Sequence, residues 1–128
     1  MDIVRQVIDA WNRNQPETAI RYLEPDVILD ATQRRINPKT YRGVEGMRAM
    51  LADRDEVWEE FRLEPDEFVA AGDWIVVIGR WVGRGRGSGL EVQQPVAHAF
   101  CLRGGRIVRA ELSYADRRAA LEAVGLRE

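Results

Sequence analysis

His98 is the only histidine of the chain, and it lies in the middle of an apolar segment that is typical of a β-strand. Side chains alternate between the two faces of a strand. His98 therefore shares one face with Val96 and Phe100, while Ala97 and Ala99 lie on the other. An imidazole on the bulky apolar face meets either a structural partner or a pocket in which it exchanges protons or donates a hydrogen bond.

Three other polar side chains are candidates for chemistry beside His98. Asp30 ends a short predicted strand and is the one carboxylate near a position suited to a general base. Alternation with Leu29 turns Asp30 toward the surface or toward an arginine partner. Tyr114 and Tyr41 carry hydroxyls that are candidates to orient a ligand, and a packing role explains each equally well. The predicted catalytic set is His98, Tyr114 and Asp30, with His98 as the acid/base group.

Other residues are expected to contact a ligand without taking part in a reaction. A hydrophobic ligand is expected to contact aromatic and aliphatic side chains near the polar candidates. The predicted binding residues are Tyr41, Trp58, Val96, Phe100, Leu29 and Leu112. Core and dimer packing is the alternative role for the aromatic residues.

Composition narrows the class of partner. The 128 residues suit one domain, and a net charge of −2 favours neither nucleic acid nor an anionic membrane. One histidine and one cysteine match no standard metal site, so we expect no metal. The glycine-rich segment 83–89 lacks the spacing of a dinucleotide loop and is predicted to be a hairpin tip, so we expect no cofactor. The first apolar run is too short for a signal peptide or membrane span, so a cytoplasmic location is expected.

Hydrophobic periodicity predicts helices in the first part of the chain and mostly strands in the rest. The predicted helices cover residues 2–13, a short stretch from Pro16 to before Pro25, residues 44–53 and residues 116–122. The predicted strands cover residues 26–31, 58–68, 74–82, 90–102 and 106–114, and residues 32–42 are predicted to form a loop. This order predicts an α+β domain with helices packed on one face of a curved antiparallel sheet.

The segment Ile75-Val76-Val77-Ile78 is apolar at every position. An antiparallel strand with one wet face alternates apolar and polar residues, so both faces of this strand are expected to be covered. The helices can cover one face. A second copy of the chain is predicted to cover the other, which gives a homodimer through the sheet.

Several local signatures resemble the SnoaL-like group of the nuclear transport factor 2-like superfamily. In chain order they are Ala10-Trp11-Asn12-Arg13, Leu23-Glu24-Pro25-Asp26-Val27, Tyr41-Arg42-Gly43-Val44-Glu45-Gly46, the stretch from Phe100 to Val108, and Tyr114-Ala115-Asp116-Arg117 with Ala120-Leu121. They span almost the whole chain, so the resemblance implies one SnoaL-like domain over residues 1–128. It also implies a cone-shaped, cystatin-like sheet around a deep pocket, and frequent homodimers.

The resemblance implies a pocket but not a reaction, because the superfamily includes ketosteroid isomerases, polyketide cyclases, epoxide hydrolases, dehydratases and proteins without chemistry. Ala31 falls at the position of the isomerase's carboxylate base, with Asp30 one residue short. His98 falls where the isomerase has an aspartate that binds the oxyanion. The cyclases place an aspartate on the last strand, whose inward positions here are expected to be Val108, Ala110, Leu112 and Tyr114.

Three functions remain open from the sequence. The first is an enzyme that binds an apolar, oxygenated small molecule and transfers protons through His98, in the manner of an isomerase, cyclase or dehydratase. The second is a non-catalytic protein that binds a hydrophobic ligand. The third is a dimerisation domain whose cone is packed shut.

Overall fold

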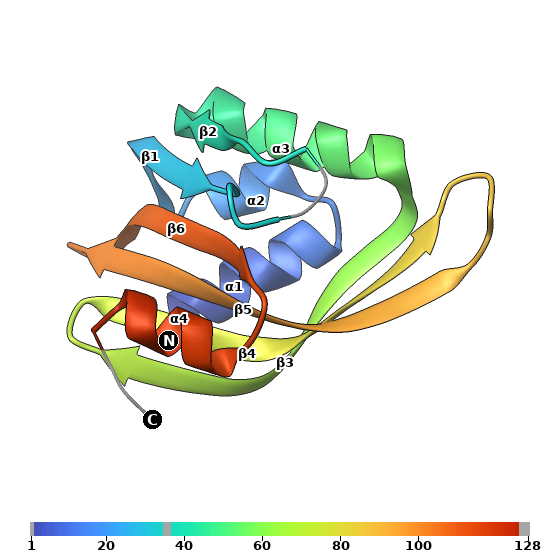
Figure 1. Cartoon of the computed structure of the whole chain (residues 1–128). Coiled ribbons are helices and arrows are strands. Elements are labelled where there is room, and N and C mark those ends of the chain that lie inside the picture. The colour runs from blue at the N-terminus through green and yellow to red at the C-terminus, as the bar shows by residue number, and fades with distance from the viewer. Residues whose placement is uncertain (1, 35–36, 126–128) are drawn as a thin grey trace.

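Four helices and six strands make up the described part of the chain (Figure 1). The computed structural model describes residues 2–34 and 37–125. In chain order the elements are α1 (Asp2–Asn12), α2 (Pro16–Ile20), β1 (Leu23–Asp30), β2 (Thr40–Arg42), α3 (Gly43–Val57), β3 (Trp58–Ala71), β4 (Trp74–Gly85), β5 (Glu91–Arg103), β6 (Arg106–Tyr114) and α4 (Arg117–Ala123). The predicted fold class is confirmed, since N-terminal helices pack on one face of a curved, mostly antiparallel sheet.

The six strands form one sheet in the order β2-β1-β6-β5-β4-β3. Neighbouring strands are antiparallel, apart from the parallel pair of β1 and β6. The prediction of a loop over residues 32–42 is wrong at β2, where Tyr41 pairs with Leu29 of β1. A strand of three residues is too short to show periodicity, and its hydrogen bonds come from β1.

The two faces of the sheet bury different clusters. We call the face that packs against α1, α2 and α3 the inner face; its buried residues include Leu29, Val77, Val96, Phe100, Ala110 and Leu112. We call the opposite face the outer face; there Val76, Ala97 and Ala99 pack against Ala120 and Leu121 of α4. Figure 1 shows α4 lying against the strands, apart from the group formed by α1, α2 and α3.

The helix α4 explains why β4 is apolar on both faces. Ile75 and Val77 belong to the inner-face core, whereas Val76 and Ile78 pack in the cluster that α4 covers. The chain thus covers both faces of this segment itself. The apolar pattern no longer requires a second subunit, although a homodimer remains a prediction.

Gly79 allows β3 and β4 to bend together. The register of these strands shifts between Pro65 and Glu67. Gly79 lies opposite Pro65, and a Cβ at Gly79 would come within 2.2 Å of the carbonyl oxygen of Glu64. A larger residue would therefore force the two strands apart at the point where the sheet curls.

The side chain of Asn12 fixes the end of α1 to the edge strand β3. Its Nδ2 donates to the carbonyl oxygen of Leu63 at 2.9 Å, and its Oδ1 accepts from the Leu63 N–H at 2.8 Å. These two bonds satisfy backbone groups that an edge strand otherwise leaves unpaired. They also hold the neighbouring Trp11 in place against the sheet.

Replacing Asn12 with Ala is expected to lower the free energy of unfolding by about 1–3 kcal/mol, because both backbone groups of Leu63 lose their partner. Gln6→Ala, at an exposed position of the same helix, is the control and should change stability by less than about 0.5 kcal/mol. Urea denaturation followed by circular dichroism measures both variants. Equal midpoints for the two would contradict the role given to Asn12.

Candidate functional site

A β-bulge in β6 places a backbone donor beside His98. Leu112 and Ser113 both lie opposite His98, because the register between β5 and β6 shifts between Ala97 and Ala99. Ser113 has a φ of +68°, in the left-handed region that residues with a side chain rarely adopt. In this conformation its backbone N–H donates to Nδ1 of His98 at 2.9 Å.

This hydrogen bond determines which imidazole nitrogen carries the proton. Because Nδ1 of His98 accepts, the proton of the neutral ring lies on Nε2. Burial lowers the pKa of His98 from 6.5 to about 4, so the neutral ring dominates at pH 7. Within residues 2–34 and 37–125, Nε2–H has no hydrogen-bond acceptor, and the residue keeps part of its surface exposed. The site therefore offers a neutral hydrogen-bond donor.

Four of the predicted binding residues share the apolar surroundings of His98. Leu29, Val96, Phe100 and Leu112 all lie in the inner-face core. The ring of Phe100 meets the imidazole edge-on, with centroids 6.4 Å apart. Val77 of β4 and Leu112 of β6 lie opposite His98, and Val96 and Phe100 flank it along β5. Leu29 of β1 lies one strand farther away, opposite Ala110 of β6.

Trp58 lies in a separate aromatic group with Phe61 and Trp81. Their ring centroids are 5.2 to 5.9 Å apart. Gly83 makes room for Trp58, since a Cβ at Gly83 would lie 2.7 Å from the indole ring. Trp81 packs against the inner-face core, so this group extends the core toward the start of β3.

Tyr114 and Asp30 belong to a polar network on the outer face. The Tyr114 hydroxyl donates to Glu111 at 2.8 Å, and Arg109 donates to Glu111 at 3.0 Å and to Asp30 at 3.1 Å. The prediction that Tyr114 faces inward is wrong, because the extra residue at the Ser113 bulge reverses the alternation. The arginine partner predicted for Asp30 is confirmed.

The surroundings keep both residues in their ordinary charge states. Burial raises the pKa of Tyr114, so its phenol stays neutral. Hydrogen bonds from the side chain and backbone of Thr32 lower the pKa of Asp30, so this group is a carboxylate at pH 7. The structure therefore does not bring Tyr114 or Asp30 together with His98 in one catalytic set.

Tyr41 is buried in the inner-face core, and its hydroxyl lies between two charged groups. Arg34 donates to the Tyr41 oxygen at 2.6 Å, and the hydroxyl donates to Asp53 of α3 at 2.6 Å. Lys39 pairs with the same carboxylate at 2.7 Å, and this bond lowers the pKa of Asp53. The Tyr41 hydroxyl is thus fully engaged within the chain, which favours a role in fixing β2 to α3.

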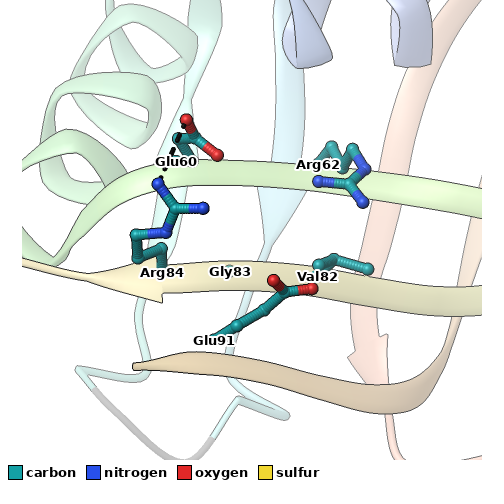
Figure 2. Close-up of a pocket in the computed structure, with 6 residues that line it drawn as sticks. All are labelled: Glu60, Arg62, Val82, Gly83, Arg84 and Glu91. Carbon is teal, nitrogen blue, oxygen red and sulfur yellow. Dashed lines mark ion pairs between the residues drawn. The ribbon is translucent and has the colours of Figure 1, made fainter. Parts of the chain in front are cut away.

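Two cavities lie away from His98. One of about 260 Å³ sits on the outer face, where Glu60 and Arg62 of β3, Arg84 of β4 and Glu91 of β5 line it with alternating charges (Figure 2). Arg84 pairs with Glu60 across it at 3.6 Å. The other cavity, of about 590 Å³, is bounded by β1 and the hairpin of β5 and β6. Neither cavity is lined by a residue of the predicted site.

The sequence analysis missed two buried donors, Trp11 Nε1 and Arg54 Nε. Neither atom has a hydrogen-bond partner in the described part of the chain. Arg54 follows the apolar stripe of α3, four residues after Met50 and three after Leu51, which is the signal that was available. It was missed because the predicted helix ends at residue 53, four residues before the end of α3 at Val57.

No group of three or more histidine, cysteine, aspartate or glutamate side chains in residues 2–34 and 37–125 is placed to hold a metal ion. In the same residues, no helix combines the length and the apolar character that crossing a membrane requires.

Comparison with solved structures defines the fold class as nuclear transport factor 2-like. A protein of that class from Burkholderia pseudomallei K96243, of unknown function, is 26% identical with a TM-score of 0.78, over 89% of this chain and 88% of that one. TerC co-crystallised with polyporic acid is 22% identical with a TM-score of 0.78, over 88% of each chain. A hypothetical protein of ketosteroid isomerase-like fold from Catenulispora acidiphila DSM 44928, in complex with trimethylamine, is 21% identical with a TM-score of 0.78, over 97% of this chain and 92% of that one.

The family follows from the sequence itself. The model of the SnoaL-like domain matches residues 4–110, so the chain belongs to the SnoaL-like domain family. This confirms the resemblance found from the sequence. A search of the curated proteins finds no match to the chain.

His98 should make stability depend on pH below neutrality. Its pKa is 6.5 in the unfolded chain and about 4 in the folded chain, so between these values the unfolded chain binds more protons. The neutral state of His98 therefore contributes to the free energy of unfolding in full above pH 6.5. This contribution is lost as the pH falls toward 4, by up to about 3 kcal/mol. His98→Asn keeps an acceptor for the Ser113 N–H but does not titrate.

The free energy of unfolding of His98→Asn is therefore expected to fall less than that of the wild type between pH 7 and pH 4. Urea denaturation at several pH values measures the difference. Parallel curves for the two proteins would show that His98 does not titrate with a lowered pKa.

Proposed function

We propose that this chain binds a small, largely apolar molecule through a carbonyl or similar oxygen, to which Nε2–H of His98 donates a hydrogen bond. The observation that carries this proposal is the bond from the Ser113 N–H to His98 Nδ1, at 2.9 Å. It leaves one neutral donor, in apolar surroundings, without an acceptor in the described residues. A neutral donor in apolar surroundings gains from a ligand oxygen, because a hydrogen bond is stronger in an environment of low polarity than in bulk water.

The same observations argue for binding in preference to proton transfer by His98. At pH 7 the Nε2 atom already carries its proton, so it cannot accept one, and a pKa of about 4 leaves almost no imidazolium to act as an acid. Asp30, the predicted base, lies on the outer face with Arg109. An isomerase-, cyclase- or dehydratase-type reaction would need a base as well as this donor, and none of the predicted site residues supplies one.

The comparisons support a small molecule as the partner. The structures with polyporic acid and with trimethylamine have the same fold as this chain, and each contains a small organic molecule. At 21 to 22% identity they show what the fold accommodates, and the chemistry of the ligand here rests on His98.

Cyclohexanone and methylenecyclohexane test the donor, because the two molecules have similar shapes and only the ketone accepts a hydrogen bond. Wild-type protein is expected to bind the ketone more tightly. His98→Asn places its amide oxygen and nitrogen at the positions of Nδ1 and Cδ2, so it has no N–H at the position of Nε2. It should weaken ketone binding about 3- to 10-fold, the effect of losing one hydrogen bond, and should leave hydrocarbon binding unchanged. Titration followed by nuclear magnetic resonance measures both affinities.

Tyr114→Phe is the matched control, since it removes a hydroxyl from the outer face. It should not change ketone binding. Equal affinities of the two compounds for the wild type and for His98→Asn would rule out His98 as the ligand's hydrogen-bond donor.

We also propose that the chain forms a homodimer through the outer face of the sheet. The charged residues around the outer-face cavity, with Glu60 and Arg84 as one pair, give such a contact complementary charges. Light scattering at micromolar concentration should then give twice the mass of the chain, falling at high salt because surface ion pairs are screened. The mass of a single chain at low salt would contradict the homodimer.

A further inference from the structure

Arg54 is a half-buried cation whose charge is only partly compensated. Its side chain is 15% exposed, and its Nε lies 3.7 Å from Asp55, a distance too long for a hydrogen bond. Asp55 is itself 44% exposed and accepts a hydrogen bond from Asn14. Burial lowers the pKa of Arg54, and the nearby carboxylate of Asp55 opposes this shift only in part.

Trp11, whose backbone oxygen Arg54 contacts, carries a second unpaired donor on its indole ring. Nη1 of Arg54 donates to the backbone oxygen of Trp11 at 2.7 Å, which joins the two residues directly. The indole Nε1–H of Trp11 and the Nε–H of Arg54 are both buried and have no hydrogen-bond partner in the part of the chain that the structure describes. Buried donors are normally paired, so two at one junction call for an acceptor.

Aromatic rings surround these donors. The guanidinium of Arg54 lies over the ring of Phe61, with 5.8 Å to its centroid. The indole of Trp11 packs against Phe100 with centroids 5.9 Å apart, and Phe100 also contacts His98. The environment is therefore apolar and flat-sided around a positive charge, which suits a planar anion.

We propose that the junction of α1, α3 and β3 is an anion site, in which Arg54 Nε and Trp11 Nε1 donate to the carboxylate or similar oxyanion of a small apolar acid. This site adds an acidic group to the ligand of the proposed function. It rests on that function in one respect, because a small molecule must be able to enter the interior. Phe100 lies between the two regions, so a ligand that reaches both would carry an acidic group and a separate oxygen acceptor.

A purely structural role for Arg54 explains less of what is observed. The bond from Nη1 to the Trp11 oxygen does fix α3 to α1. It leaves Arg54 Nε and Trp11 Nε1 without acceptors, and a neutral side chain in place of Arg54 would avoid the cost of burying a charge. An anionic ligand accounts for the charge and for both unpaired donors together.

Benzoate and benzamide test the site, because they differ in charge while keeping the same ring. In two-dimensional nitrogen–proton spectra, benzoate is expected to move the Trp11 Nε1–H and Arg54 Nε–H signals downfield in the wild-type protein, and benzamide is not. Trp11→Phe, which keeps an aromatic ring, and Arg54→Gln should each weaken benzoate binding about tenfold or more. Arg48→Gln is the control, because Arg48 lies on the same helix and forms its ion pairs with Glu17 and Glu45 at the surface.

Each outcome decides the proposal. Chloride or formate that moves the same two signals and competes with benzoate supports an anion site that does not need the ring. Equal effects of benzoate and benzamide, or benzoate signals confined to other residues, would overturn it. The wild-type spectra suffice if a variant does not fold, and His98→Asn with cyclohexanone tests the proposed function separately.

Discussion

The hydrogen bond from the Ser113 N–H to Nδ1 of His98 is the constraint on which the site depends. It requires a left-handed residue in the last strand, and a residue with a side chain adopts that conformation only where the surrounding structure enforces it. Here the pairing of β6 with β5 on either side of the bulge does so. This hydrogen bond fixes the imidazole in one orientation and one tautomer, and it leaves the proton of the ring on Nε2.

The same bulge separates two chemical environments. Leu112, before the bulge, lies in the inner-face core with Phe100, and Tyr114, after it, lies with Ala97 on the outer face. The inner face thereby has His98 as its polar group on β5, among apolar neighbours. The carboxylates of Asp30 and Glu111 lie on the outer face, where both pair with Arg109. The three residues predicted to form one catalytic set are thus divided between the two faces of one sheet.

Periodicity and resemblance predicted the order of the elements, the fold class and the inward faces of β1 and β5, because these follow from local patterns. Val96, Phe100 and Leu29 accordingly lie on the inner face. The bulge could not be predicted, since Ser113 is an unremarkable residue for a strand and its φ is set by partners distant in sequence. The unpaired donors of Trp11 and Arg54 could not be predicted for a similar reason, because the lack of a hydrogen-bond partner depends on the three-dimensional neighbours of an atom. The position of α4 over β4 was also visible only in the folded structure. Because α4 covers this face, the apolar sequence of β4 is no longer an argument for a dimer.

The tautomer of His98 tests the account most directly. Long-range nitrogen–proton correlation spectra at pH 7 report the protonation of both ring nitrogens, and a spectrum of His98→Asn confirms the assignment because the chain has one histidine. The account predicts a neutral ring with the proton on Nε2 and with Nδ1 accepting a hydrogen bond. A ring protonated on Nδ1, or an imidazolium at that pH, would contradict it.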